Sequence, residues 1–157
     1  MKALVTGASS GIGKEIAIYL AEVGIDLIIV ARREDRLEEL KSILKTNVEI
    51  IATDISIEEN CVKLYKQAKD IDILVNNAGF GVFGEFENTS LTSELEMIKT
   101  NICAVHTLTK LFLKDMKAKN NGYILNVASI AAFVPGPLMA TYYSSKSYVF
   151  KLTREYL

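Results

Sequence analysis

The sequence has no tryptophan, one histidine, two cysteines and two prolines in 157 residues. Cys61 and Cys103 are far apart and match no CxxC or metal-ligand spacing. We therefore expect buried free thiols in a reducing, cytoplasmic setting. The lone His106 has no second ligand candidate at motif spacing, so it is more typical of a helix-surface or packing residue than of a metal ligand or catalytic base. The sequence predicts no metal site.

Strong charge and long apolar runs are lacking too. The net charge is −1 and no stretch is strongly basic, which argues against nucleic acid as the main partner. No apolar run reaches the ~18 residues that a membrane span needs. The amino terminus has no charged leader with a cleavage site, which predicts no signal peptide. Half of the residues are hydrophobic, so we expect one domain, residues 1–157, with a substantial core.

A glycine-rich segment follows the first predicted strand, residues 3–5. Gly7, Gly11 and Gly13 precede a helical pattern of apolar residues spaced three or four apart. In a strand–turn–helix context, such glycines let the backbone approach a pyrophosphate, which the free N–H groups of the helix then bind. Glycine triplets also occur in ordinary tight turns, so the motif alone is weak. Its context favours phosphate binding.

The second predicted strand, residues 27–31, is apolar throughout and is followed by Arg32 and Arg33. The ribose of a dinucleotide should lie at this position, where NAD sites usually place an acid. Asp26 lies at the opposite end of the strand. A guanidinium offers a planar fork of donors that suits a 2′-phosphate, so we predict NADP(H) in preference to NAD(H). Alternatively, both arginines are solvated residues ahead of a surface helix.

The remaining pattern alternates helices with apolar strands. Helices are predicted over 34–45, 58–69 and 93–117, and strands over 49–53, 71–75 and 123–128. This alternation predicts an α/β, doubly wound parallel sheet of Rossmann type with strand order 3-2-1-4-5. Ligands bind such sheets off the carboxyl ends of the strands. Asp54 lies at that edge, where it could bind an adenine amino group or cap the turn Asp54-Ile55-Ser56.

The predicted helix over 93–117 has an apolar arc wider than the ~100° stripe that one packed face needs. We therefore expect it to be buried on two sides or to contact another subunit. Together with the last helix, predicted over 141–157, it favours a homodimer or homotetramer. Asn101 is a polar residue inside the long helix and needs a hydrogen-bond partner.

Tyr142 and Lys146 lie four residues apart on the last predicted helix, which places them on one face. The strand over 123–128 brings Ser129 to the same sheet edge. A nearby ammonium favours phenolate and so lowers the pKa of Tyr142. A shift from pKa ~10 to ~7 takes roughly 4 kcal/mol. Such pairs are common on surfaces, but their convergence with the glycine loop at one edge favours a functional site.

With these motifs in place, the sequence resembles the short-chain dehydrogenase/reductase family over essentially its whole length. The motifs are Thr6-Gly7-Ala8-Ser9-Ser10-Gly11-Ile12-Gly13, Asp54, Asn76-Asn77-Ala78-Gly79, Asn101, Ser129 and Tyr142-x-x-x-Lys146. Each is modest alone, but together and in this order they are highly specific.

The resemblance implies an oxidoreductase that interconverts a small-molecule alcohol and carbonyl. Tyr142 would exchange the proton, Ser129 would orient the substrate oxygen, and Lys146 would lower the Tyr142 pKa and hold the nicotinamide ribose. Asn101 would anchor a water next to Lys146. The cofactor would contact Gly7, Ser9, Ser10, Gly11, Ile12, Gly13, Arg32, Arg33, Asp54, Ile55, Asn77, Ala78, Gly79, Tyr142 and Lys146.

One departure from the family matters. Its members carry two further strands and an intervening helix after the Tyr-Lys helix, so the resemblance predicts a C-terminally truncated sheet that lacks the last two strands. The strand over 123–128 would then be an exposed apolar edge. The alternative function is a catalytically silent nucleotide-binding or assembly module.

Overall fold

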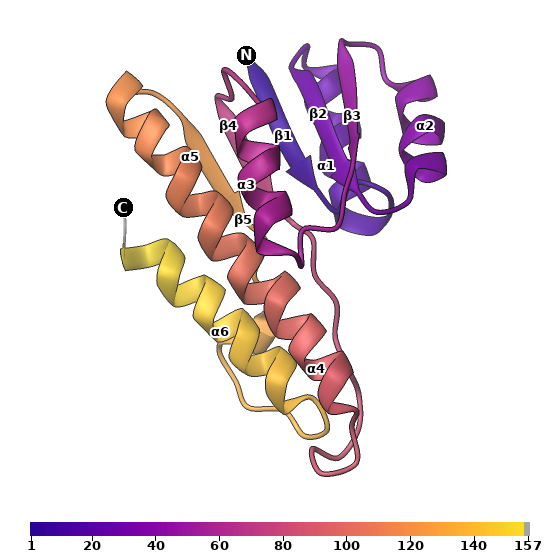
Figure 1. The fold of residues 1–157 in the computed structure, drawn as a ribbon, viewed down its shortest axis with the longest axis vertical. Coiled ribbons are helices and arrows are strands. Elements are labelled where there is room, and N and C mark those ends of the chain that lie inside the picture. Colours follow the sequence, from indigo (N-terminus) through magenta and orange to yellow (C-terminus); the bar gives the residue numbers. More distant parts are fainter. Residues whose placement is uncertain (156–157) are drawn as a thin grey trace.

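The computed structural model describes residues 1–155 and contains a five-stranded sheet in the order β3-β2-β1-β4-β5 (Figure 1). All four neighbouring strand pairs are parallel, so the predicted fold class and strand order are confirmed. The strands are β1 (Lys2–Thr6), β2 (Asp26–Ala31), β3 (Val48–Ala52), β4 (Ile73–Asn76) and β5 (Tyr123–Asn126).

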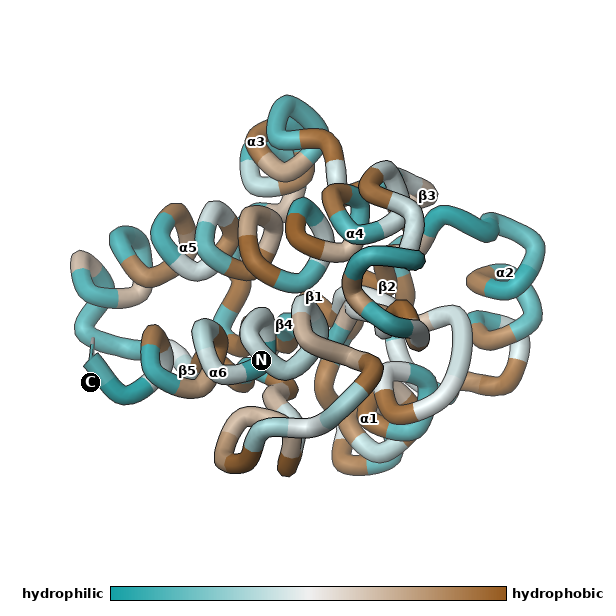
Figure 2. Tube along the Cα trace, turned by 90° about the horizontal axis from the view of Figure 1, so that it is seen from below, coloured by the Kyte–Doolittle hydropathy of each residue, from teal (hydrophilic) through white to brown (hydrophobic). Residues whose placement is uncertain are grey.

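Helices connect the strands and cover both faces of the sheet. Figure 2 shows α3 and α5 on one side of the strands and α1 on the other. The helices are α1 (Gly11–Glu22), α2 (Glu34–Ile43), α3 (Glu58–Gln67), α4 (Leu91–Ile98), α5 (Val105–Lys119) and α6 (Ala140–Glu155), with a π-helical segment at Lys99–Ala104 and a 3₁₀ turn at Ile130–Ala132.

The inner strands are buried on both faces, because successive side chains of a strand point to opposite sides. On one face, Val5 and Ile29 pack with Leu37 and other residues of α1 and α2. On the other face, Leu4 and Ile28 belong to a second cluster with α3 and α5. The continuous apolar pattern of the sequence therefore reflects two cores, one on each side of a single sheet.

The long helix predicted over 93–117 is present as a continuous α4–π–α5 run from Leu91 to Lys119, but its middle is π-helical. The π-helical segment, Lys99–Ala104, contains Asn101. Such insertions are rare and often mark functional sites. The run is buried both against the sheet and against α3, where the rings of Phe112 and Tyr65 lie 5.2 Å apart. Burial on two sides is therefore confirmed.

The outer strand β5 ends at Asn126, two residues earlier than predicted. Its register places Tyr123 beside Ile73 and Leu125 beside Val75, on the face that α1 and α2 cover further along the sheet. Tyr123 is 62% exposed and Leu125 is 48% exposed. The expected apolar sheet edge is therefore present in the structure.

The cysteines fit the expectation only in part. Both are free thiols, but Cys103 is exposed and only Cys61 is buried. Burial raises the pKa of the Cys61 thiol to about 11. Within residues 1–155, no helix is long and apolar enough to cross a membrane. Tyr156 and Leu157, which we had placed in the last helix, lie outside the described residues.

Candidate active site

A cavity of about 710 Å³ runs along the carboxyl ends of the strands. It extends from the glycine loop to α6, as the alternation of strands and helices predicts. Most of the predicted site residues line it, namely Gly7, Ser9, Ser10, Gly11, Ile12, Arg32, Arg33, Asp54, Ile55, Asn77, Ala78, Gly79, Tyr142 and Lys146. Gly13, Asn101 and Ser129 are not among its lining residues.

The glycine loop between β1 and α1 depends on two different properties of glycine. Gly7 and Gly11 have φ of 67° and 55°, the left-handed region that other residues rarely adopt. Gly13 is buried behind the loop, where a Cβ would overlap the Asn77 amide and the Gly7 carbonyl. The start of α1 therefore lies close against the end of β4. Its free backbone N–H groups suit an anion.

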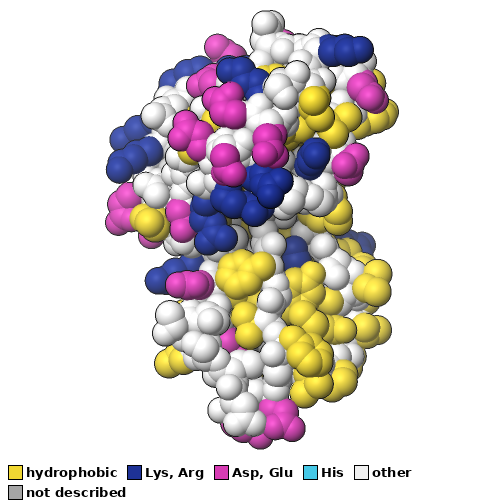
Figure 3. All heavy atoms as spheres, turned by 90° about the vertical axis from the view of Figure 1, so that its right-hand side faces the viewer, with side chains coloured by type: hydrophobic (Ala, Val, Ile, Leu, Met, Phe, Trp, Pro, Cys, Tyr) yellow, Lys and Arg dark blue, Asp and Glu magenta, His cyan; other side chains and the backbone are white. Residues whose placement is uncertain are grey.

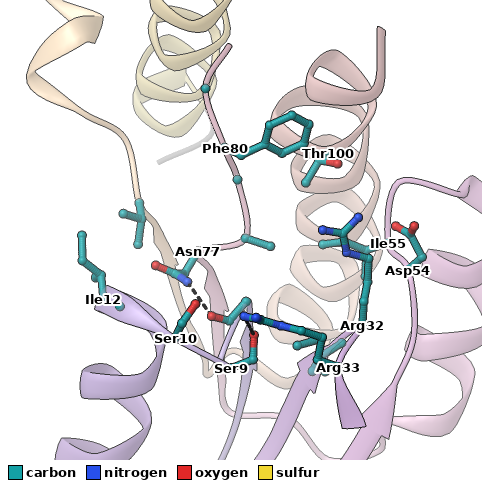
Figure 4. A pocket seen from close by; sticks show the side chains of 18 of the residues that line it. Ser9, Ser10, Ile12, Arg32, Arg33, Asp54, Ile55, Asn77, Phe80 and Thr100 are labelled. Atoms are coloured by element: carbon teal, nitrogen blue, oxygen red, sulfur yellow. Dashed lines mark hydrogen bonds between the residues drawn. The ribbon is translucent and has the colours of Figure 1, made fainter. Parts of the chain in front are cut away.

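The side chains of Thr6 and Asn77 hydrogen-bond this loop to the end of β4. Asn77 Nδ2 donates to the carbonyl oxygen of Thr6 at 3.1 Å. It also donates to that of Gly7 at 3.3 Å (Figure 4). Thr6 Oγ1 accepts from the backbone N–H groups of Asn77 at 3.0 Å and Ala78 at 3.2 Å. Sequence reasoning gave Thr6 no role. The only available signal was a polar residue at the end of an apolar strand.

The arginine pair lies where the chain leaves β2. Figure 4 shows Arg32 beside Asp54 and Ile55, and Arg33 directed toward Ser9. Arg33 Nη2 donates to Ser9 Oγ at 3.5 Å, a long and therefore weak hydrogen bond. Among the residues that the structure describes, neither guanidinium has a carboxylate within 4.0 Å. Both arginines remain available to a phosphate.

Asp54 follows β3 and shows one of the two alternatives that the sequence left open, the cap of the turn. Its Oδ1 accepts the backbone N–H of Ser56 at 2.9 Å, which caps the turn. The same residue lines the cavity together with Ile55. The turn therefore orients the carboxylate while leaving it at the wall of the cavity.

Tyr142 and Lys146 lie on the first turns of α6, at the other end of the cavity. Lys146 is only 6% exposed, and its Nζ lies 5.8 Å from the centre of the Tyr142 ring. Burial lowers the pKa of Lys146. The α6 start is anchored by Thr141 Oγ1, which donates to Glu94 Oε2 of α4 at 3.0 Å. The spacing-based prediction of a tyrosine–lysine pair on one face is consistent with this geometry.

Asn101 has the partners that the sequence required. It is 1% exposed, its Nδ2 donates to the carbonyl of Phe80 at 2.9 Å, and its Oδ1 accepts the N–H of Phe80 at 3.1 Å. A third bond runs from Nδ2 to Ser145 Oγ at 3.1 Å. Sequence reasoning passed over Ser145. The sequence signal for Ser145 was a small polar residue between Tyr142 and Lys146, on the side of the helix that faces inward.

Ser129 follows the carboxyl end of β5 as predicted, but three residues beyond it, because the strand ends two residues early. Its Oγ accepts the N–H of Ala131 at 3.1 Å and caps the 3₁₀ turn.

His106 Nδ1 lies 2.7 Å from Tyr148 Oη, which links α5 to α6. Among the described residues, no group of three His, Cys, Asp or Glu is placed to hold a metal ion.

Hydrophobic side chains gather on the lower half of the face in Figure 3, below a band of Lys and Arg. The loops that follow β4 and precede α6 carry many exposed apolar residues. They include Phe80, Phe83, Phe86, Ile130, Phe133, Val134 and Leu138. Of these residues Phe80 lines the cavity, together with Val127, Ala128 and Met139, whereas Arg32 and Arg33 line it near the glycine loop.

The motifs and the fold agree with known proteins. The family model described as short chain dehydrogenase matches residues 1–156. The chain belongs to the short-chain dehydrogenase family. An uncharacterised oxidoreductase of Bacillus subtilis is 36% identical to it over 157 residues, which cover 97% of this chain and 60% of that protein. The chain thus spans about three fifths of that relative's length.

Solved short-chain dehydrogenase structures show the same arrangement of elements. A bulky-bulky ketone specific alcohol dehydrogenase from Comamonas testosteroni superposes with a TM-score of 0.92 at 30% identity, covering 98% of this chain and 64% of that one. A short-chain dehydrogenase from Sphingobium yanoikuyae, solved in complex with NADPH, has a TM-score of 0.91 at 29% identity and covers 98% and 62%.

Proposed function

We propose that this protein is an NADP(H)-dependent oxidoreductase that interconverts an alcohol and a carbonyl by hydride transfer. The observation that carries the proposal is that one cavity joins the glycine loop to Tyr142 and Lys146. Its length brings together a pyrophosphate-binding backbone and a pair of groups suited to proton exchange. The nicotinamide cofactor would supply the hydride.

The cofactor-holding residues divide along the cavity. The glycine loop and the start of α1 would bind the pyrophosphate, and Asp54, Ile55 and Ala78 would contact the adenosine. Arg32 and Arg33 would bind the 2′-phosphate, since neither has a carboxylate partner among the described residues. The NADPH complex of the Sphingobium relative supports a phosphorylated cofactor.

Tyr142 would give its phenolic proton to a carbonyl or accept one from an alcohol. Lys146, whose Nζ lies 5.8 Å from the centre of the Tyr142 ring, would hold the nicotinamide ribose. Ser129 Oγ accepts a hydrogen bond from Ala131, so its own hydroxyl proton is available for the substrate oxygen. Asn101 would anchor a water next to Lys146.

A second candidate function is a catalytically silent nucleotide-binding or assembly module. The exposed Tyr123 and Leu125 of β5 favour it, because an apolar edge strand pairs readily with another chain. Assembly as a homodimer or homotetramer would cover these side chains. Light scattering at micromolar concentration measures the oligomeric state, and a monomer would refute the homodimer or homotetramer.

Turnover tests the enzyme proposal directly. The 157-residue chain is incubated with NADPH and a panel of apolar ketones and aldehydes, and NADPH loss is followed by absorbance. We expect carbonyl-dependent oxidation of NADPH. A folded chain that binds NADPH but consumes none with any carbonyl would instead support the silent module.

A further inference from the structure

Ser145 lies at the centre of the contacts between α6 and the π-helical segment. Its side chain is 0% exposed. Its Oγ donates to the carbonyl oxygen of Tyr142 at 2.7 Å and accepts from Asn101 Nδ2 at 3.1 Å. One hydroxyl therefore joins the turn that carries Tyr142 to the buried amide of Asn101.

These bonds define which way the Asn101 amide faces. A serine hydroxyl has a single proton, and that proton is directed to Tyr142, so Ser145 can only accept from Asn101. The NH₂ group of Asn101 must then face Ser145, which leaves its Oδ1 for the N–H of Phe80. Without Ser145, the amide loses the contact that ties its orientation to α6.

The segment that Asn101 holds forms the cavity wall next to the tyrosine and lysine. A Cβ at Gly79 would lie 3.0 Å from Asn101 Oδ1, and one at Gly81 would lie 3.3 Å from the Tyr142 ring. The backbone around Phe80 is therefore packed closely between Asn101 and Tyr142. A small shift of the amide would move this wall relative to Tyr142.

We propose that Ser145 is a positioning residue for the nicotinamide end of the cofactor. It acts through Asn101, which holds the Gly79–Phe80–Gly81 wall against Tyr142, and it does not touch the reacting atoms. This inference rests on the proposed function, because it assumes that a nicotinamide occupies that end of the cavity. The hydrogen bonds of the Ser145 and Asn101 side chains run to Phe80, Tyr142 and each other, and none reaches Asp54 or Ile55 at the proposed adenine end.

The test compares two probes in Ser145→Ala. NADPH occupies both ends of the cavity, whereas adenosine 2′,5′-bisphosphate fills only the adenine end. Affinities come from calorimetric titration, and the fluorescence of bound NADPH reports how well the nicotinamide is ordered. We expect NADPH to bind five- to tenfold more weakly with a lower fluorescence, while the affinity for the bisphosphate stays within twofold of wild type.

Ser144→Ala is the matched control, because it makes the same change at an exposed position of the same helix. It should leave both affinities and the fluorescence unchanged. If Ser145→Ala weakens both probes equally, the serine has a general structural role and the proposal is overturned. Unchanged binding and fluorescence would overturn it too. Ser145→Cys, nearly the same size with a weaker donor, is used if the alanine variant does not fold.

A double-mutant cycle tests whether Ser145 acts through its partner. In an Asn101→Ala background, Ser145→Ala should change the NADPH affinity by less than twofold, because the bond is already lost. Full additivity of a tenfold effect, equal to about 1.4 kcal/mol, would contradict the mechanism. If wild type binds the bisphosphate but not NADPH, the proposed function fails. If wild type binds both and Ser145→Ala behaves like wild type, only the role of Ser145 fails.

Discussion

Lys146 Nζ donates a hydrogen bond of 2.9 Å to the carbonyl oxygen of Val127, just beyond the end of β5. The N–H of Val127 in turn donates to the carbonyl of Asn76 at 2.9 Å, which continues the pairing with β4. The buried ammonium of α6 is therefore tied to the end of the sheet. The position of the Tyr-Lys pair depends on β4 and β5 as well as on its own helix.

This buried ammonium predicts a pH dependence of stability. Burial lowers the pKa of Lys146 in the folded chain below the value of about 10.4 expected when it is unfolded. Between these values the unfolded chain holds more protons, so the Lys146 contribution to the free energy of unfolding rises with pH. Urea titrations from pH 7 to 10.5 should show wild type gaining stability relative to Lys146→Met as pH increases. Lys151→Met, exposed on the same helix, is the control; a pH-independent difference for Lys146→Met would contradict the assignment.

Tyr142→Phe should abolish turnover and leave the NADPH affinity within about twofold. The change removes only the phenolic oxygen, and a positioned acid–base group contributes roughly 10²- to 10⁴-fold to rate. The neighbouring Tyr143→Phe is the matched control, since the Tyr143 ring packs against Gly136 instead of lining the cavity. Activity that survives in Tyr142→Phe would show that another group moves the proton.

Replacing Arg32 and Arg33 together by Ala should weaken NADPH at least tenfold more than NADH. Hydrogen bonds to a charged phosphate contribute about 1.5–3 kcal/mol, and NADH lacks the 2′-phosphate. Arg36→Ala serves as control, because Arg36 is paired with Glu39 on the outside of α2. Calorimetric titration measures both cofactors. Equal losses for NADPH and NADH would refute 2′-phosphate binding by these arginines.

Gly13→Ala should weaken NADPH more than tenfold and lower the melting temperature. The added methyl group would overlap the Asn77 amide and the Gly7 carbonyl, so α1 must move away from β4. Gly24→Ala separates this crowding from backbone strain. Its φ is 80° but nothing lies within 4 Å of the added carbon, so only a left-handed penalty of about 1 kcal/mol is expected. A Gly13→Ala variant with native cofactor affinity would contradict the close approach.

The parts of the fold that follow local rules were predictable from the sequence. Apolar strands alternating with helices predicted the strand order, and parallel strands place the glycine loop, Arg32 and Tyr142 at one edge. The π-helical segment was not predictable, because its apolar spacing resembles that of a regular helix. The Asn101–Ser145 bond joins residues 44 positions apart, so no local pattern contains it. The exposure of Cys103 was not predictable either, because it depends on how the helices pack against one another.

The most direct test of the account is a calorimetric titration of the 157-residue chain with NADPH and, in parallel, with NADH. One cavity contains the glycine loop, Arg32 and Arg33. We therefore expect the chain to bind NADPH and to prefer it over NADH by tenfold or more. A folded chain that binds neither cofactor would contradict the proposal that this cavity is a nicotinamide dinucleotide site.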